Sequence, residues 1–320
     1  RRPPRSTLFP YTTLFRSEML VGLSKAQLCE VEKSIRVTIA ETVSPASDKI
    51  PRVLPHHALA SWVKRINRSL PLEVFTTNYD VLLERAFEEA RVPVFDGFVG
   101  THEPFFYPEC LDDEALLPSP KWIRLWKLHG SVNWSLETKN GSNRIVRSFV
   151  SQEGQLILPS YRKYTESRKQ PYVAYIDRLS FALNHEHALL IVCGYSFRDE
   201  HINALLYNAL DKHKSMNIIA LQFDAIKETD HVVTIGLERS NLSLIGPNAA
   251  VISGQWGIWR LNRPVDSHTS SFMDVAFDSN AAPEDEGGAS PNSADLEGRM
   301  RLGDFNHFCR FLGAMGAEKL

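Results

Sequence analysis

Short apolar runs that stop abruptly at polar residues are the feature that most limits how this chain can fold. Three such runs stand in the segments LEVFTTNYD (residues 72–80), WIRLWKLHGS (122–131) and ALLIVCGYSF (188–197). Amphipathic helical patterns follow the first and the third run, over residues 81–90 and 199–210. Apolar strands that alternate with such helices are typical of a parallel sheet with helices on both faces. The sequence therefore predicts an α/β fold.

Weaker patterns of the same two kinds fill the rest of the chain. Helical spacing of apolar residues predicts helices over residues 22–43 and 59–66, with a loop between them at 44–55. Further apolar runs predict strands at residues 217–223, 231–237, 249–254 and 256–261.

Composition divides the chain into a folded body and a tail. We expect one domain over residues 18–265, because strand and helix patterns continue to its end. Pro, Gly, Ser and acidic residues dominate much of 266–300, which predicts a largely disordered linker. An apolar pattern within residues 301–320 then predicts a short C-terminal helix.

Composition also excludes several classes of protein. The net charge of -2 and the pI of about 6.6 give no global attraction to nucleic acid or to an anionic membrane. No run reaches the ~18 apolar residues that a membrane span needs. The 4 cysteines are far apart and form no CxxC pair, which fits a reducing compartment. We therefore expect a cytoplasmic protein that binds neither membrane nor nucleic acid directly.

The polar clusters at the strand ends are the candidate ligand site. Ligands of an open parallel sheet bind outside the carboxyl ends of the strands. Taken singly, each cluster has a plain structural reading, because an Asn or Asp before a helix is usually a cap and a strand-end His is usually a satisfied structural group. Their shared placement nevertheless predicts one site, formed by Thr76, Thr77, Asn78, Tyr79, Asp80, His129, Gly130, Ser131, Gly194, Tyr195, Ser196 and Phe197.

The same segments resemble a known family, the sirtuins. TTNYDVLLERAFEEA is similar to their TQNID-type motif, KLHGS to their catalytic LHG segment, and GYSFRDEHINALL to their late Gly–x–Ser loop. The last segment has the form found in bacterial sirtuin-like proteins that cleave NAD in defence. The resemblance covers roughly residues 18–223, and it implies a Rossmann-like sheet that binds NAD.

By this resemblance, Asn78 and His129 are the catalytic residues. Asn78 would hydrogen-bond a ribose hydroxyl or order the attacking water, and His129 would act as general base on a ribose hydroxyl or on the nucleophile. Asp80 would hold the nicotinamide ribose, while Gly194 and Ser196 would contact the adenosine half. The other expected NAD contacts are Thr76, Thr77, Gly130, Ser131, Tyr195 and Asp199, for which capping of the following helix is an equal alternative.

The activity that the resemblance implies is NAD⁺ hydrolysis to nicotinamide and ADP-ribose, with a role in antiphage defence. Two other readings stay open. One is a protein deacylase or ADP-ribosyltransferase that uses the same chemistry with a different nucleophile, and the other is a non-catalytic module that senses a nucleotide. NAD is the expected small-molecule partner, and a homo-oligomer or a defence-system partner protein is left open.

The sequence departs from the family in two respects. Sirtuin deacylases carry a four-cysteine zinc module after the His motif, but residues 134–172 contain no cysteine, so we expect no zinc. The family also begins with a strand and a Gly–Ala–Gly–x–Ser phosphate loop, a pattern that residues 18–75 lack. Residues 1–17 include TLFPYTTLFRS, which resembles a translated sequencing adapter. We expect that this artefact replaces the phosphate loop and leaves the domain truncated at its N-terminus.

Overall fold

The structure is a computed structural model. It describes residues 19–20, 23–44, 49–139, 141–148, 155–156, 170–260, 274–279 and 298–315. The segment expected to be an adapter, residues 1–17, lies outside the described residues, and so does most of the predicted linker, 266–300.

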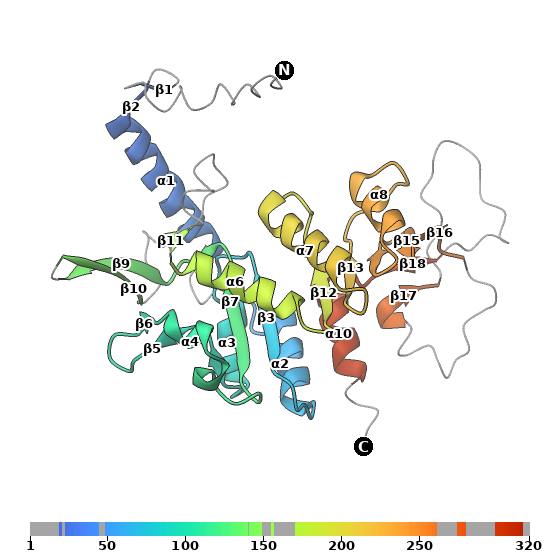
Figure 1. Ribbon diagram of the computed structural model, residues 1–320, viewed down its shortest axis with the longest axis horizontal. Helices are drawn as coiled ribbons and strands as arrows, with labels where there is room; N and C mark the ends of the chain where they lie inside the picture. Colours follow the sequence, from blue (N-terminus) through green and yellow to red (C-terminus); the bar gives the residue numbers. More distant parts are fainter. Residues whose placement is uncertain are drawn as a thin grey trace, which may run out of the picture.

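Two mainly parallel sheets form the central layer of the molecule (Figure 1). In the first, β7 (Ile123–Lys127) lies between β3 (Leu72–Thr76) and β4 (Val94–Phe95), and all three strands are parallel. The second has the order β12-β13-β14-β15-β16, in which the first three strands are parallel and the last two antiparallel. Its strands are Leu189–Cys193, Asn217–Leu221, Leu242–Ile245, Ala249–Ile252 and Gln255–Ile258.

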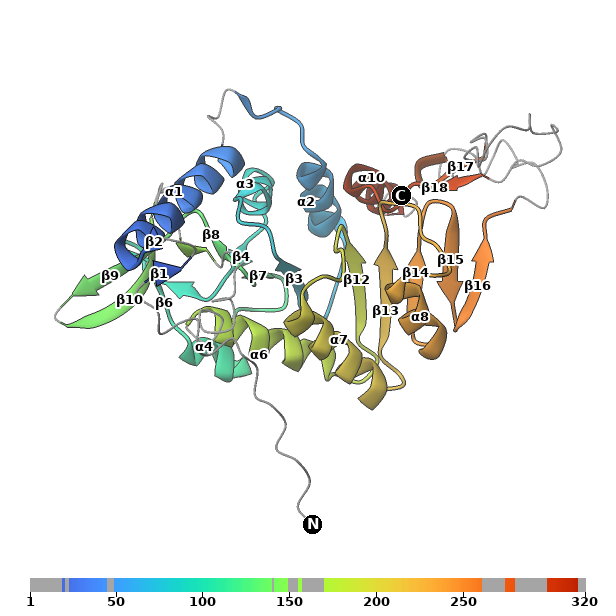
Figure 2. The same ribbon diagram turned by 90° about the horizontal axis from the view of Figure 1, so that it is seen from above.

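Helices cover both faces of this layer (Figure 2). One face carries α1 (Lys25–Val43), α2 (Pro55–Arg65), α3 (Leu82–Glu89) and α10 (Phe305–Met315). The other carries α4 (Glu109–Asp112), α6 (Tyr172–Leu183), α7 (Glu200–Lys212) and α8 (His231–Glu238). The predicted α/β fold with a parallel sheet and helices on both faces is therefore confirmed.

Several small elements complete the fold. An antiparallel sheet beside the first half consists of β5 (Phe98–Val99), β6 (Phe105–Phe106), β10 (Ser142–Arg147) and β9 (Trp134–Lys139). A 3-10 turn spans Glu114–Leu116. Short pairs join Met19–Leu20 (β1) to Leu23–Ser24 (β2), Gly130–Ser131 (β8) to Gln155–Leu156 (β11), and Phe277–Asp278 (β17) to Arg299–Met300 (β18).

The two main sheets meet at β3 and β12 without a ladder between them. Among the described strands, β3 pairs with β7 alone and β12 with β13 alone, so each is an edge, and the two edges lie next to each other in both ribbon views (Figures 1 and 2). β12 has an apolar sequence, yet Leu189 is 60% exposed and Ile191 44%. Apolar strands of this kind normally lie inside a sheet.

Strand β3 is held to its own half by a buried ion network. The Glu73 carboxylate accepts hydrogen bonds from the Trp126 indole (2.7 Å) and from the guanidinium groups of Arg124 (3.3 Å) and Arg178 on α6. Both arginines also pair with Glu114. Because the charges of β3, β7 and α6 are paired with one another, burying them is tolerated, although Arg124 Nε has no hydrogen-bond partner within the described residues. The network ties the beginning of β3 to β7 and α6.

The prediction of a strand at residues 231–237 is wrong, because this segment is helix α8. A run of Val, Thr and Ile favours a strand, but packing against neighbours overrides this weak preference. Val233 and Gly236, three residues apart, lie on the buried face of the helix. A Cβ on Gly236 would lie 3.2 Å from Leu244 and 3.3 Å from Val251, so glycine lets the helix approach β14 and β15 closely. Strand β14, between α8 and β15, was not predicted.

Helix α10 lies within residues 301–320, the segment predicted to form a short C-terminal helix. It packs on α2, with the Arg65 guanidinium donating to the carbonyl of Gly313 (3.1 Å). The described parts of the predicted linker include the β17–β18 pair. After β18 the chain continues into α10, which lies on α2.

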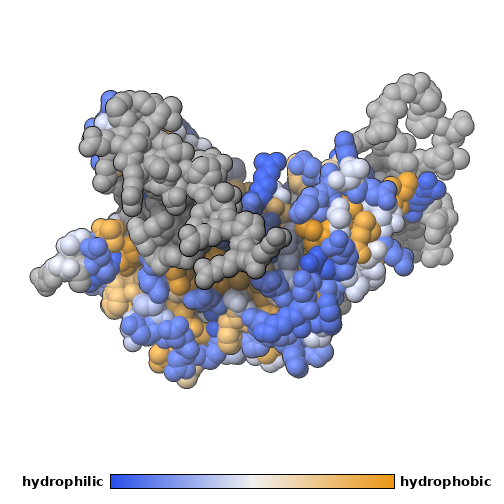
Figure 3. All heavy atoms as spheres, turned by 45° about the horizontal axis from the view of Figure 1, so that its top comes forward, coloured by the Kyte–Doolittle hydropathy of each residue, from blue (hydrophilic) through white to orange (hydrophobic). Residues whose placement is uncertain are grey.

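No described helix is long and apolar enough to cross a membrane. On the face that Figure 3 shows, hydrophilic side chains predominate and hydrophobic ones form separate patches.

Candidate functional site

The loops that follow β3 and β7 are joined to each other by backbone hydrogen bonds. Thr76 pairs with Lys127 in the parallel ladder, so both strands end at the same height. Beyond them, the amide of Leu128 donates to the carbonyl of Thr76 (2.9 Å), and the amide of Val132 to that of Tyr79 (3.1 Å). The first two predicted clusters therefore form one unit.

Lys127 holds this unit together, a role that we did not predict from the sequence. Its side chain is buried, 1% exposed as a residue, at the end of β7. The ammonium donates to the carbonyls of Tyr79 (3.4 Å) and Asp80, and it pairs with Glu84 of α3 at 2.9 Å. A buried ammonium needs such partners, since an uncompensated charge inside a protein is very costly.

The polar side chains of the first cluster shape their own loop. The Thr76 hydroxyl accepts a hydrogen bond from the Asn78 amide (3.1 Å), and the Asp80 carboxylate accepts one from the amide of Leu82, the first residue of α3 (3.0 Å). Thr77 is half-buried, and Asn78 is exposed. The loop thus presents the Asn78 side chain to solvent above the sheet edge.

His129 and Asp199 connect the second cluster to the third. His129 Nε2 lies 3.0 Å from Asp199 Oδ2, and the two side chains are 17% and 8% exposed. Asp199 also caps α7, because its Oδ1 accepts from the amides of His201 (3.1 Å) and Ile202 (3.4 Å). Capping was one of the two roles left open for Asp199. Gly130, next to the histidine, has φ +95°, which only glycine adopts without strain.

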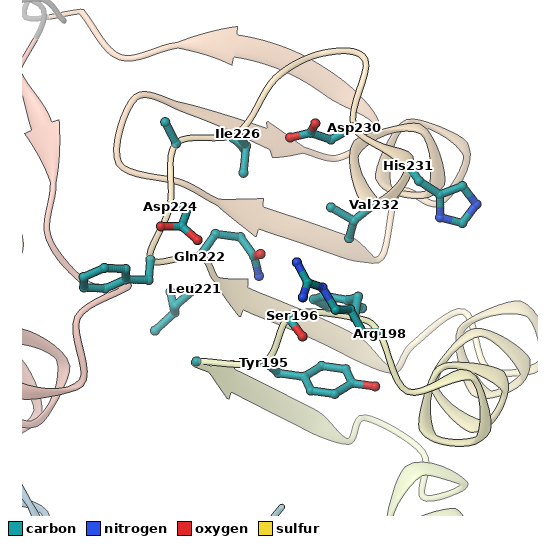
Figure 4. Close-up of a pocket in the computed structure, with 14 residues that line it drawn as sticks. Tyr195, Ser196, Arg198, Leu221, Gln222, Asp224, Ile226, Asp230, His231 and Val232 are labelled. Carbon is teal, nitrogen blue, oxygen red and sulfur yellow. The ribbon is translucent and has the colours of Figure 1, made fainter. Parts of the chain in front are cut away.

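A cavity of about 420 Å³ opens at the ends of β12 and β13, and Arg198, the residue before Asp199, lines it (Figure 4). Gly194, Tyr195 and Ser196 line it, as expected of the third cluster, whereas Asp199 does not. The opposite wall comes from the residues after β13 and from the start of α8. Its lining residues are Gly194, Tyr195, Ser196, Phe197, Arg198, Leu221, Gln222, Phe223, Asp224, Ala225, Ile226, Asp230, His231 and Val232.

Three polar side chains of the cavity were not foreseen. Figure 4 shows Arg198, Gln222 and Asp224 on its walls. The Gln222 amide nitrogen is buried and has no hydrogen-bond partner in the structure, which is rare for a buried donor. The signal was present, since QFD follows the strand NIIAL as the other clusters follow theirs, but the strand was predicted to run on to Phe223.

The third cluster is rigid. Gly194 has φ +72° and Phe197 φ +55°, so the loop makes two left-handed turns, one of them at a residue that rarely adopts this conformation. The rings of Tyr195 and Phe197 contact each other, with their centroids 4.9 Å apart. Burial raises the pKa of the Tyr195 phenol, so it stays a neutral donor to Asn203 Oδ1 (2.7 Å). Burial also raises the pKa of the Cys193 thiol to about 11, which makes this cysteine a poor nucleophile.

His56 is a further side chain close to the first cluster. Its ring packs on Phe305 of α10 at 5.1 Å, and its Nδ1 is buried without a hydrogen-bond partner. Burial lowers the pKa of His56, and the charge of Asp80 opposes this shift. The sequence offered no reason to connect His56 with the site.

The described residues contain no group of three or more His, Cys, Asp or Glu side chains that could hold a metal ion. Where sirtuin deacylases have their zinc module, the described part of residues 134–172 forms the β9–β10 hairpin and the start of α6. The absence of zinc stays a prediction.

Comparison with known families agrees with this geometry. Residues 72–244, more than half of the chain, match the model of the SIR2-like domain. The chain belongs to the SIR2-like family. No curated protein matches it. The matched range runs from β3 to β14, so it contains all three strand-end clusters and the whole cavity.

Membership of the SIR2-like family indicates an NAD-related activity. The contacts bring the three predicted clusters together, through Tyr79 between the first two and through His129 and Asp199 between the last two. The individual roles of the site residues toward NAD stay predictions.

Replacing Lys127 by Met should lower the free energy of unfolding by about 3 kcal/mol, since it leaves Glu84 and two carbonyls without their cation. Urea unfolding measures the effect. Arg85→Met is the matched control, because it removes the cation of the Arg85–Glu89 pair on α3, the helix that also carries Glu84. This more exposed pair contributes at most about 0.5 kcal/mol. Equal midpoints for the two variants would show that Lys127 does not hold the loops.

The protein should purify without stoichiometric zinc, and a chelator should leave its melting temperature unchanged. A structural zinc site normally needs four ligands, and no such group occurs in the described residues. Elemental analysis that finds about one zinc per chain would contradict this prediction.

Proposed function

We propose that this SIR2-like domain cleaves the bond between nicotinamide and ribose in NAD⁺, with water as the acceptor. The observation that carries the proposal is the meeting of three strand-end loops from the two sheets, with a His–Asp pair that connects them and a cavity of about 420 Å³ lined by the third loop. This volume lies within the range of ligand pockets, ~300–1,000 Å³.

The cavity suits the adenosine half of the substrate. Gln222 offers a buried amide donor that has no partner within the described residues, which matches the ring-nitrogen acceptors of adenine or the hydroxyl oxygens of ribose. Asp224 offers a carboxylate, the group that commonly accepts from ribose hydroxyls in nucleotide-binding α/β folds. The exposed cation of Arg198 suits a phosphate. Gln222 and Asp224 line the wall opposite Tyr195 and Ser196, whereas Arg198 belongs to the same loop as Tyr195 and Ser196.

The reaction assigns a role to each of the two catalytic residues. The oxygen of water bonds to C1′ of the nicotinamide ribose as the C1′–N bond breaks. The electron pair of the C1′–N bond leaves with neutral nicotinamide. Asn78, exposed above the edge, orders the water or a ribose hydroxyl. His129 accepts the proton of the water and later releases it to solvent. A positioned base of this kind contributes ~10²–10⁴-fold to a rate.

The antiphage role is part of the proposal, and it rests on the form of the GYSFRDEHINALL segment alone. A deacylase or ADP-ribosyltransferase would use the same C1′ chemistry with another nucleophile. Release of ADP-ribose from NAD⁺ without any peptide or acceptor protein supports the hydrolase, and release only with an acceptor supports the transferase. A sensor module would bind NAD⁺ and leave it intact.

We also propose that a further parallel strand, with a phosphate-binding loop after it, inserts between β3 and β12. The two unpaired edges and the exposed apolar side chains of β12 support this. In doubly wound folds with the order 3-2-1-4-5-6, the first strand has this central place, and the loop after it binds pyrophosphate.

His129→Ala should reduce NAD⁺ cleavage by ~10²–10⁴-fold, and Asn78→Ala should abolish it, with little change in melting temperature. Asn78 is exposed and His129 stands after a strand end, outside the core. Chromatography of released nicotinamide measures both.

His213→Ala serves as the control for the histidine variant. His213 is also half-buried with one side-chain partner, Asn184 at 2.9 Å, but it follows the opposite end of α7. Its variant should cleave NAD⁺ at the normal rate. Turnover in His129→Ala equal to that of His213→Ala would remove His129 as the base.

A further inference from the structure

We infer that Asp199 is a positioning residue that sets which nitrogen of His129 is the base. The inference rests on the proposed cleavage of NAD⁺ and adds a residue to it. The structural observation behind it is that both oxygens of the Asp199 carboxylate have partners. Oδ1 accepts from the amides of His201 and Ile202 in α7, and Oδ2 lies 3.0 Å from His129 Nε2.

The carboxylate determines the tautomer of the imidazole. A carboxylate only accepts hydrogen bonds, so Nε2 of a neutral His129 carries the proton and donates it to Asp199. The lone pair then stands on Nδ1, for which the structure gives no hydrogen bond within the described residues. Nδ1 is therefore the atom that takes the proton of the attacking water, and Asp199 stabilises the imidazolium that results.

The Asp199 carboxylate has little conformational freedom. It is buried, and helix α7 holds its Oδ1 through the amides of His201 and Ile202. The backbone before it is fixed as well, because the Tyr195 hydroxyl lies 3.2 Å from the Asp199 carbonyl and the Asn203 amide donates to Phe197 (2.7 Å). The loop that lines the cavity thus ends on the carboxylate that orients the base.

Asp199→Asn tests the inference sharply, because the helix dictates how the amide is oriented. The side-chain oxygen must stay on the two backbone amides, so the NH₂ group replaces Oδ2 and donates to Nε2. The proton of a neutral His129 then moves to Nδ1, and the base is lost. Asp199→Ser keeps a cap of similar strength but is too short to replace the bond to His129.

We expect kcat for NAD⁺ cleavage to fall by ~10²–10⁴-fold in Asp199→Asn, with KM changed less than threefold, and to fall also in Asp199→Ser. Asp304→Asn is the matched control. Asp304 caps α10 in the same way, through the amides of Asn306 (2.7 Å) and His307 (3.3 Å), and has no part in the site. This variant should keep the normal kcat.

The tautomer is measured directly by ¹⁵N NMR of the 320-residue chain labelled at histidine, with His129 assigned from its absence in His129→Gln. We expect the Nε2–H form at pH 8 in the original chain and the Nδ1–H form in Asp199→Asn. The same tautomer in both, or a normal kcat in Asp199→Asn and Asp199→Ser, overturns the inference. If the original protein cleaves no NAD⁺, the proposed function fails, while the NMR result still decides the role of Asp199.

Discussion

The buried ammonium of Lys127 is the interaction on which the site depends most. Two strands that end at the same height do not by themselves order the loops beyond them, and a loop of polar residues is easily mobile. Lys127 reaches across from β7 to the carbonyls of Tyr79 and Asp80 and to Glu84. One charge thereby fixes the Asn78 loop, the start of α3 and the origin of the His129 loop. A neutral side chain would leave all three partners buried without a donor.

The fold could be predicted from the sequence because strand ends and apolar periodicity are local properties. The apolar runs of β3, β7, β12 and β13 and the helices behind them need only nearest neighbours in sequence to be recognised. The convergence of the clusters followed from the geometry of parallel strands, which places all carboxyl ends at one edge. A resemblance to the sirtuins then predicted that NAD binds at that edge, and the SIR2-like family match agrees with the resemblance.

What the sequence did not reveal depends on contacts between distant segments. The run HVVTIGL forms a helix because Gly236 packs against Leu244 and Val251, which no local pattern announces. Lys127 looked like a polar residue at a strand end, and its burial depends on Glu84, 43 residues away in the chain. The pairing of His129 with Asp199 joins residues 70 positions apart. Each of these features is a matter of tertiary packing rather than propensity.

The site also joins two halves that share no backbone ladder in the described structure. Asn78 and His129 belong to the sheet of β3 and β7, whereas the cavity belongs to the sheet of β12 and β13. The distance between His129 and the cavity is therefore set by the few contacts that cross between the halves, such as His129 with Asp199 and α10 on α2. A strand paired to both β3 and β12 would fix that distance through two ladders. On this view its loop would bind phosphate, and the strand itself would set the geometry on which the His129–Asp199 pair acts.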